Sequence, residues 1–341
     1  MRWMGLLAAA ICAPALAFAN CDPGETKITF PHDAPATGHP KGEAAAFLAQ
    51  MVNMELQGRL CMEVIADAPN YSDASVTEGL ADGSFQMAAP AMGTMGELSP
   101  RFLIFDMPFL FKDLDVVLAY QESPAGLALL TEMADEGVRG LGYWTDGMKE
   151  LSGPLPLRSP GDVAGLNVGI QPSVIEAHYI DTLQATPRPL DPRALQTALR
   201  DGVVNAQNST FTTIASRRLH LNQAAVTVSN HGLVQYMLVV SEPFWQSLDP
   251  ATQADLEFLV MLVGLERNRF AFEFSEQSKR EIRSDGTPIV ELSEEERYAW
   301  VRAMQPTWFA FGGDVGFDQI AAALYLEREL AAGRLESFTG R

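Results

Sequence analysis

Short apolar segments alternate with longer amphipathic ones along most of the chain. The short segments are rich in Val, Ile, Phe and Met and have the length of β-strands, whereas the longer ones repeat apolar positions with a helical period. The predicted strands are Ile28–Phe30, Met62–Ile65, Phe85–Ala88, Gly140–Trp144, Val168–Ile170, Val203–Ala206 and Gln235–Val240. This alternation is typical of an α/β protein in which helices cover mixed, mostly parallel sheets.

Two helical segments carry clear boundary signals. Asp249 precedes a proline and begins the longest segment, which no further proline interrupts before about Arg283. At 1.5 Å per residue this helix is roughly 50 Å long, which is more than one small domain requires. Ser293 and Glu296 form a capping-box pattern that begins a later helix. We therefore expect two lobes that are both spanned by the long helix.

The chain contains two similar helix–strand units, residues 75–91 and 191–210. In each unit a short helix ends at a glycine and a strand leads into polar or small residues. Ligands of open α/β sheets bind at the carboxyl ends of strands. We therefore expect Ala89–Met92 and Gln207–Thr210 to face a shared cleft.

The N-terminus has the pattern of an export signal. An early Arg is followed by an apolar run and by Ala17-Phe18-Ala19, a small-residue cleavage site. We expect a signal peptide over residues 1–19, cleaved after Ala19, and a periplasmic mature protein. Cys12 leaves a lipoprotein open as an alternative, although the residues before it make a poor lipobox.

Two cysteines, Cys21 and Cys61, remain after cleavage. Disulfides persist in the periplasm, and each cysteine precedes a predicted strand. We expect a Cys21–Cys61 disulfide, with two free thiols as the alternative.

Charge and motifs exclude several functions. The formal net charge is −19, which argues against nucleic acid as a partner because phosphates are neutralised by Lys and Arg. The longest later apolar run, Phe258–Leu265, is too short to span a bilayer, so the mature protein should be soluble. No nucleophile elbow, Walker loop, dinucleotide fingerprint or zinc-protease motif is present, and the five histidines do not cluster. This profile favours a solute-binding protein over an enzyme.

Several segments occur in the order typical of one family. They are His32, Lys41-Gly42, the run Phe105-Asp106-Met107-Pro108-Phe109-Leu110-Phe111, Gly142-Tyr143-Trp144, Gly147-Met148-Lys149, Asp162 to Leu166, Ala198 to Gln207, and Ser229-Asn230-His231-Gly232. Together they resemble the DctP-type solute-binding proteins of TRAP transporters (tripartite ATP-independent periplasmic transporters) from about Thr26 to Leu265. The resemblance implies a receptor that binds a small organic solute, usually a carboxylate, and delivers it to a membrane-embedded permease. It implies no metal or organic cofactor.

The resemblance also implies two hinged lobes. We assign residues 20–146 plus 238–276 to lobe I and 147–237 plus 277–341 to lobe II, and we expect a monomer. Two other functions remain open, namely a secreted hydrolase or lyase on the same scaffold and an extracytoplasmic sensor input.

Three positions depart from the family pattern. The Arg that grips the substrate carboxylate in the family is replaced by Gly169, and the usual ligand-contacting Asn is Ser209. A third cation, often Arg in the family, is Lys149. A guanidinium matches a carboxylate with a rigid fork, whereas an ammonium is a point charge. We therefore expect a ligand other than a standard C4-dicarboxylate, either a different carboxylate or a cationic, zwitterionic or neutral solute. Gly169 should leave room for a bulkier or reoriented ligand, and loss of binding is the alternative.

The remaining candidate site residues follow from these motifs. We expect the solute's polar groups to be hydrogen-bonded by Gln207, Asn208 and Ser209, and Lys149 to be the remaining cation of the site. Trp144 and Phe211 are expected to form walls, and Tyr71 lies near them, whereas Tyr236 is expected in the core. Other residues expected to line the cleft or hinge are His32, Asn230, His231 and Gln235.

Overall fold

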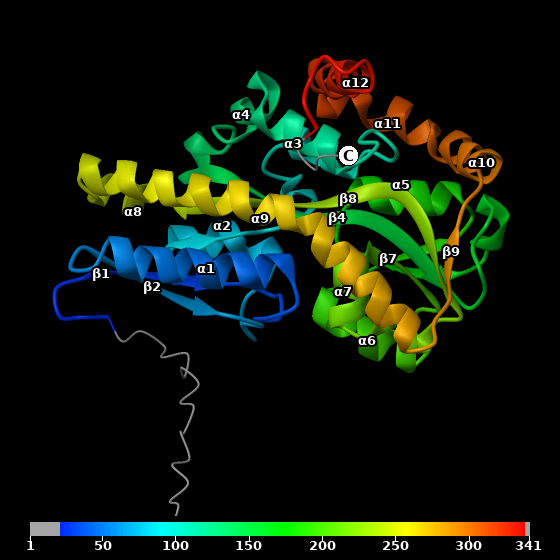
Figure 1. The fold of residues 1–341 in the computed structure, drawn as a ribbon, viewed down its shortest axis with the longest axis horizontal. Coiled ribbons are helices and arrows are strands. Elements are labelled where there is room, and N and C mark those ends of the chain that lie inside the picture. The colour runs from blue at the N-terminus through cyan, green and yellow to red at the C-terminus, as the bar shows by residue number, and fades with distance from the viewer. Residues whose placement is uncertain (1–20, 338–341) are drawn as a thin grey trace, which may run out of the picture.

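The computed structural model describes residues 21–337 of the chain (Figure 1). The strands are β1 (Thr26–Pro31), β2 (Leu60–Ile65), β3 (Met87–Ala88), β4 (Val138–Gly153), β5 (Asn167–Ile170), β6 (Thr186–Pro189), β7 (Ala206–Thr210), β8 (Ala225–Ser241) and β9 (Ile289–Glu291). The helices are α1 (Pro40–Glu55), α2 (Val76–Ala81), α3 (Leu114–Glu122), α4 (Pro124–Leu129), α5 (Val174–Thr182), α6 (Pro192–Arg200), α7 (Phe211–Ser216), α8 (Glu242–Ser247), α9 (Pro250–Ser284), α10 (Glu294–Met304), α11 (Pro306–Val315) and α12 (Phe317–Ala331), and a 3₁₀ segment, η3, covers Pro100–Asp106. The expected signal peptide and Cys12 lie outside the described residues.

The strands form a parallel pair, β1–β2, and a larger sheet of order β3-β8-β4-β7-β5-β6, in which β9 pairs with β8. Within the described chain, four of the seven strand pairings are parallel, and the antiparallel ones all involve β4 or β8. The predicted α/β class with a mixed, mostly parallel sheet is confirmed.

Two strands are much longer than the apolar pattern predicts. The predicted segments at residues 140–144 and 235–240 belong to β4 and β8, of 16 and 17 residues. Their antiparallel ladder has three register shifts, among them one between Thr145 and Gly147. Such bulges bend a strand and increase its twist, so that β4 and β8 can run from one lobe into the other. Because polar residues occur at these bends, the apolar pattern of the sequence does not show that each strand is continuous.

The strand predicted at residues 203–206 also differs from the structure. Val203 is 57% exposed and follows Gly202, whose φ is +72°, so this part of the chain is a turn. The strand β7 begins only at Ala206 and includes the buried polar residues Asn208 and Thr210. The polar side chains of this strand are buried against other residues in the structure, and the hydropathy of the sequence does not reveal such contacts.

Helix α9 is the predicted spine. It has 35 residues, and its N-terminus is capped by Asp249, which accepts hydrogen bonds from the N–H groups of Ala251 and Thr252. The first half packs on α1 in lobe I, where Leu256 and Val260 are buried, and the later part packs on α7 in lobe II (Figure 1). The prediction of one long helix across both lobes is therefore confirmed.

Three hydrophobic clusters stabilise this arrangement. One joins β1, β2, α1 and the first half of α9, and another joins α6, α7 and Ile282. The largest lies on the other side of the long sheet, under α3, α5 and the C-terminal helices. Helix α12 packs on α3, and α11 packs on both α5 and η3, so the C-terminal helices contact elements of both lobes (Figure 1).

The predicted disulfide between Cys21 and Cys61 is present. In the β1–β2 ladder Cys61 lies opposite Lys27, six residues after Cys21. The bond therefore fastens the start of the described chain to the first residues of β2.

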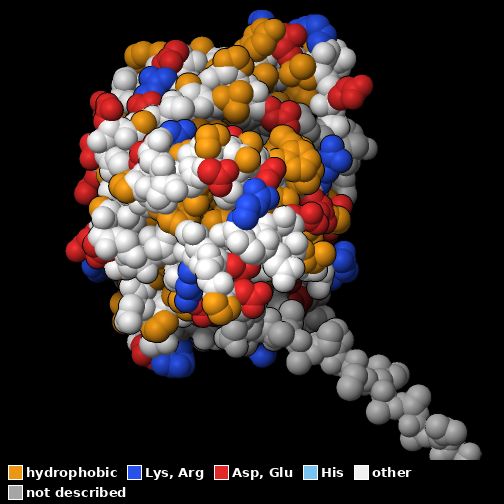
Figure 2. Space-filling model, turned by 90° about the vertical axis from the view of Figure 1, so that its left-hand side faces the viewer, with side chains coloured by type: hydrophobic (Ala, Val, Ile, Leu, Met, Phe, Trp, Pro, Cys, Tyr) orange, Lys and Arg blue, Asp and Glu red, His pale blue; other side chains and the backbone are white. Residues whose placement is uncertain are grey.

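On the face of the molecule that Figure 2 shows, acidic side chains are mixed with basic and hydrophobic ones. Within residues 21–337, no helix combines the length and the apolar character that a membrane span requires.

Candidate functional site

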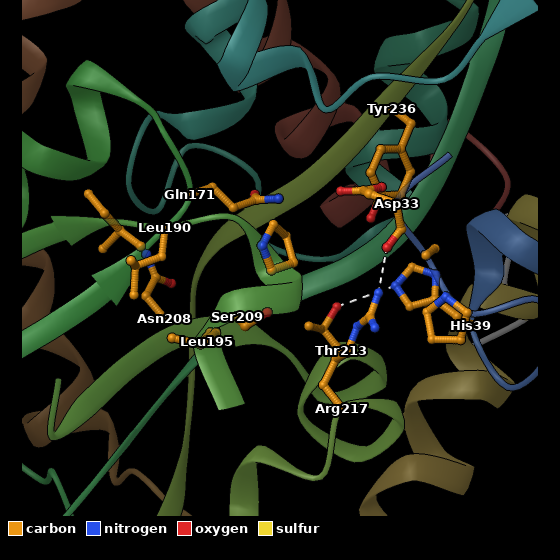
Figure 3. A pocket seen from close by; sticks show the side chains of 14 residues that line it. Asp33, His39, Gln171, Leu190, Leu195, Asn208, Ser209, Thr213, Arg217 and Tyr236 are labelled. Carbon is orange, nitrogen blue, oxygen red and sulfur yellow. Dashed lines mark hydrogen bonds between the residues drawn. The ribbon is translucent and has the colours of Figure 1, made fainter. Parts of the chain in front are cut away.

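A small cavity of about 20 Å³ lies where the two lobes meet, at the carboxyl ends of β1, β5 and β7. Its lining is Asp33, Ala34, Pro35, His39, Ile170, Gln171, Leu190, Pro192, Leu195, Asn208, Ser209, Thr213, Arg217 and Tyr236 (Figure 3). This volume holds about one water molecule. A solute of several heavy atoms can therefore enter only when the lobes or these side chains move apart, as in hinged binding proteins.

The lobe I side of the cavity is acidic. The Lys41 ammonium lies 2.7 Å from Asp33 Oδ1, 3.7 Å from Asp73 Oδ2 and 4.0 Å from the centre of the Tyr236 ring. Burial alone would raise the pKa of Asp33, but the charge of Lys41 outweighs it and lowers this pKa to about 2. Burial and the neighbouring Asp33 charge raise the pKa of Asp73 to about 6. Both carboxyl groups are thus largely ionised near pH 7.

A third buried carboxylate, Asp146, lies behind Tyr236 at the crossing of the lobes. It accepts a hydrogen bond of 2.9 Å from the Thr210 hydroxyl and a longer one of 3.4 Å from Tyr236. The Nε2 atom of His39 lies 3.6 Å from it and 3.3 Å from the Thr213 hydroxyl. Burial lowers the pKa of His39 although Asp146 opposes the effect, so the imidazole is neutral at pH 7.

Two arginines of lobe II contact loops of lobe I. Arg193, at the start of α6, donates to the carbonyl oxygens of Ala68 and Tyr71, and Asp191 holds its guanidinium with two hydrogen bonds. Arg217, just after α7, donates to the carbonyl oxygen of Asp33 (Figure 3) and also to the carboxylate of Asp67. We call Arg193 and Arg217 the interlobe arginines. They join segments that lie more than 100 residues apart in the sequence.

The wall beside Gly169 is apolar. A Cβ atom at this position would lie 2.4 Å from Leu195 Cδ1, 3.6 Å from Val204 and 3.7 Å from Leu190 Cδ1. Gly169 itself is not in the cavity lining, but two of the residues that such a Cβ would meet, Leu190 and Leu195, are. In this conformation Leu195 fills the space beside Gly169 that the sequence leads us to expect for a larger ligand.

Lys149 does not line the cavity. Its ammonium lies 3.5 Å from Asp106 and forms a shorter ion pair with Glu176, and the side chain is 1% exposed. Burial disfavours the charged amine, but the carboxylates of Glu176 and Asp106 outweigh this and raise the pKa of Lys149. Lys149 is therefore a fixed, fully paired cation inside the protein.

The same buried network includes two further residues predicted for the site. The amide of Asn208 donates to Glu176 and Tyr179, and its oxygen lies 3.0 Å from His231 Nε2. His231 also contacts the Ser229 hydroxyl, and burial lowers its pKa to about 3. The side-chain amide of Asn208 is thus occupied, although the residue lies in the cavity wall.

The other predicted residues lie in the core or at the strand crossing. Trp144 and Phe211 belong to hydrophobic clusters and do not line this cavity, contrary to the expectation that they form its walls. Five further predicted residues lie outside the lining. Tyr71 packs on Phe85, His32 accepts a hydrogen bond from the Ala34 N–H, and Gln207 donates one to Ser152. Gln235 is hydrogen-bonded to Gln121 and Thr145, and Asn230 has a positive φ of +43°. Ser209 and Asn208 are the two predicted residues in the lining.

Sequence reasoning missed most of the lining. Tyr236 was expected in the core, and it is buried in the lobe I cluster, but its ring also lines the cavity. His39 carried one available signal, because it precedes Pro40 and caps α1 by accepting from the Lys41 N–H. Gln171 directly follows strand β5, where a ligand contact is expected. Arg217 carried no local signal, because its partners belong to the other lobe.

Comparisons with known proteins show the family of this chain. The family model described as "Bacterial extracellular solute-binding protein, family 7" (DctP) matches residues 30–313. The C4-dicarboxylate-binding periplasmic protein DctP of Vibrio cholerae is 35% identical, over 94% of this chain and 97% of that protein, and the DctP protein of Rhodobacter capsulatus is 31% identical, over 93% and 96%. A TRAP periplasmic solute-binding protein from Shewanella oneidensis with bound succinate superposes with a TM-score of 0.86 at 31% identity, over 89% of this chain and 99% of that one. The chain belongs to the DctP family of bacterial extracellular solute-binding proteins.

Proposed function

We propose that this protein captures a small organic solute between its lobes, delivers it to a membrane-embedded permease, and binds a solute other than a standard C4-dicarboxylate. Membership of the family supports the receptor role, and similar proteins bind succinate or L-malate according to their solved structures. The observation that carries the ligand proposal is Gly169. At this position the family resemblance places an arginine, whereas here Leu195 occupies the adjoining space.

The free energy at stake is large enough to change specificity. Hydrogen bonds to charged groups contribute about 1.5–3 kcal/mol each, and a bidentate guanidinium supplies two of them. No cation takes over this role on the described lobe II wall, because Lys149 is paired with Glu176 and Arg217 with Asp67. A carboxylate placed against Leu190 and Leu195 would lose its water without gaining a charged partner.

This proposal predicts the effect of restoring the arginine. Gly169→Arg combined with Leu195→Ala should create binding of succinate or L-malate that the unchanged protein lacks. Leu195 must be shortened because a Cβ at position 169 meets its Cδ1 atom at 2.4 Å. Thermal unfolding with added solute provides the measurement, since a ligand at 100 times its dissociation constant stabilises by about 2.7 kcal/mol.

Leu195→Ala alone is the matched control, and it should leave both dicarboxylates without effect. Strong stabilisation of the unchanged protein by succinate would contradict the ligand proposal. A folded double variant that responds to no small carboxylate would show that position 169 does not reach the solute.

A further inference from the structure

The cavity region contains more acids than cations. Among the described residues around it, five carboxylates face three cationic side chains; the acids are Asp33, Asp67, Asp73, Asp146 and Asp191, and the cations are Lys41, Arg193 and Arg217. Arg193 pairs with Asp191 and Arg217 with Asp67, so Lys41 alone faces the other three. The nearby His39 is neutral. Buried charges are normally paired, so this surplus of two carboxylates favours the binding of a positively charged group.

Asp33 presents this charge to the cavity. Its side chain is 9% exposed and lies in the cavity lining, opposite Gln171 (Figure 3). One carboxylate oxygen accepts from Lys41 at 2.7 Å, and among the described residues Lys41 is the one side chain that donates to this carboxylate. Asp73 Oδ1, which is also buried, has no hydrogen-bond partner among the described residues.

The opposite wall carries one cation, Arg217, and the rest of it is apolar, as at Leu190 and Leu195, or neutral and polar, as at Gln171 and Ser209. The guanidinium of Arg217 already donates to the carbonyl oxygen of Asp33 and to Asp67. A carboxylate in this cavity would be repelled by Asp33, whereas a cation would be attracted.

From these observations we propose that the cavity binds the ammonium group of an amine-bearing organic solute, with the Asp33 carboxylate as its acceptor. This inference rests on the proposed receptor function and narrows its ligand class. The hydrocarbon part of the solute packs on Leu190 and Leu195. The Tyr236 ring, which already carries the Lys41 ammonium at 4.0 Å, is a further surface suited to cations.

Three four-carbon probes of equal length test the charge preference. Butane-1,4-diamine, butane-1,4-diol and succinate differ only in their end groups, and their affinities are measured by titration calorimetry at low salt. We expect the diamine to bind most tightly and succinate most weakly. Asp33→Asn should lower the affinity for the diamine about tenfold or more, because a charge-assisted hydrogen bond is lost.

The matched control is Asp82→Asn, which removes an exposed acid of the same lobe outside the cavity lining and should change nothing. The inference is overturned if succinate binds best, if the diamine does not bind, or if Asp33→Asn leaves its affinity unchanged. Tight succinate binding would still support the receptor role. That role fails separately if native mass spectrometry finds no small molecule retained from a metabolite extract.

Discussion

Replacing Lys149 with methionine should lower the free energy of unfolding by about 3–5 kcal/mol, the cost of breaking a buried ion pair by removing one partner. The substitution leaves Glu176 and Asp106, both under 5% exposed, without their cation. The amide of Asn208 and the hydroxyl of Ser173 still donate to these two carboxylates, but they are neutral. Urea unfolding followed by circular dichroism gives the measurement.

The loss should depend on pH in a direction that the buried carboxyl group sets. Burial raises the pKa of Glu176 in the folded protein to about 7, so the folded state takes up a proton more readily than the unfolded chain. The corresponding stability is present below about pH 4.5 and is lost as the pH rises through about 7. Without Lys149 this pKa rises further, so the deficit of the variant should be larger at pH 8 than at pH 5.

Lys27→Met is the matched control for this experiment. Lys27 pairs with Glu63 on the surface, where both side chains are at least 40% exposed. Exposed pairs contribute about 0–1 kcal/mol, so the control should unfold almost as the unchanged protein does. An equally small effect of Lys149→Met would mean that Lys149 and Glu176 are not paired inside the protein.

Much of the scaffold could be predicted because its signals are local. The cap at Asp249, the helical pattern that follows it to about Arg283, and the capping box of Ser293 and Glu296 all depend on neighbours within four residues. The Cys21–Cys61 bond could be predicted from the export signal and from the number of cysteines.

The site was less accessible because its contacts are made between distant segments. Lys149 carries the charge expected of a ligand contact, but only the fold shows that Glu176 already neutralises it. Leu195 gave no signal as the neighbour of Gly169, since the two residues meet through helix packing on the sheet. Trp144 lies next to the family motifs, yet its side chain packs on Phe30 in the core. A motif identifies the position of a residue on a strand, whereas the direction of its side chain follows from registers and bulges that the sequence does not state.

Removing both interlobe arginines should open the protein. In Arg193→Gln with Arg217→Gln, the charged donors to the carbonyl oxygens of Ala68, Tyr71 and Asp33 and to the Asp67 carboxylate are lost. Charged hydrogen bonds contribute about 1.5–3 kcal/mol each, and water replaces part of this when the lobes separate. A net loss of about 3 kcal/mol would shift the ratio of closed to open molecules by a factor on the order of 100.

Pulsed electron resonance between two spin labels measures this shift without any solute. Met54→Cys on α1 and Val203→Cys before β7 place the labels on different lobes, at side chains that are 61% and 57% exposed. The double variant should lengthen the distance distribution, whereas Arg200→Gln, an exposed arginine on α6 paired with Asp201, should leave it unchanged. Identical distributions for the double variant and the unchanged protein would show that these arginines do not hold the lobes together. A lengthened distribution would instead mean that part of the affinity for any solute comes from contacts the solute never touches, because binding and closure share one free energy.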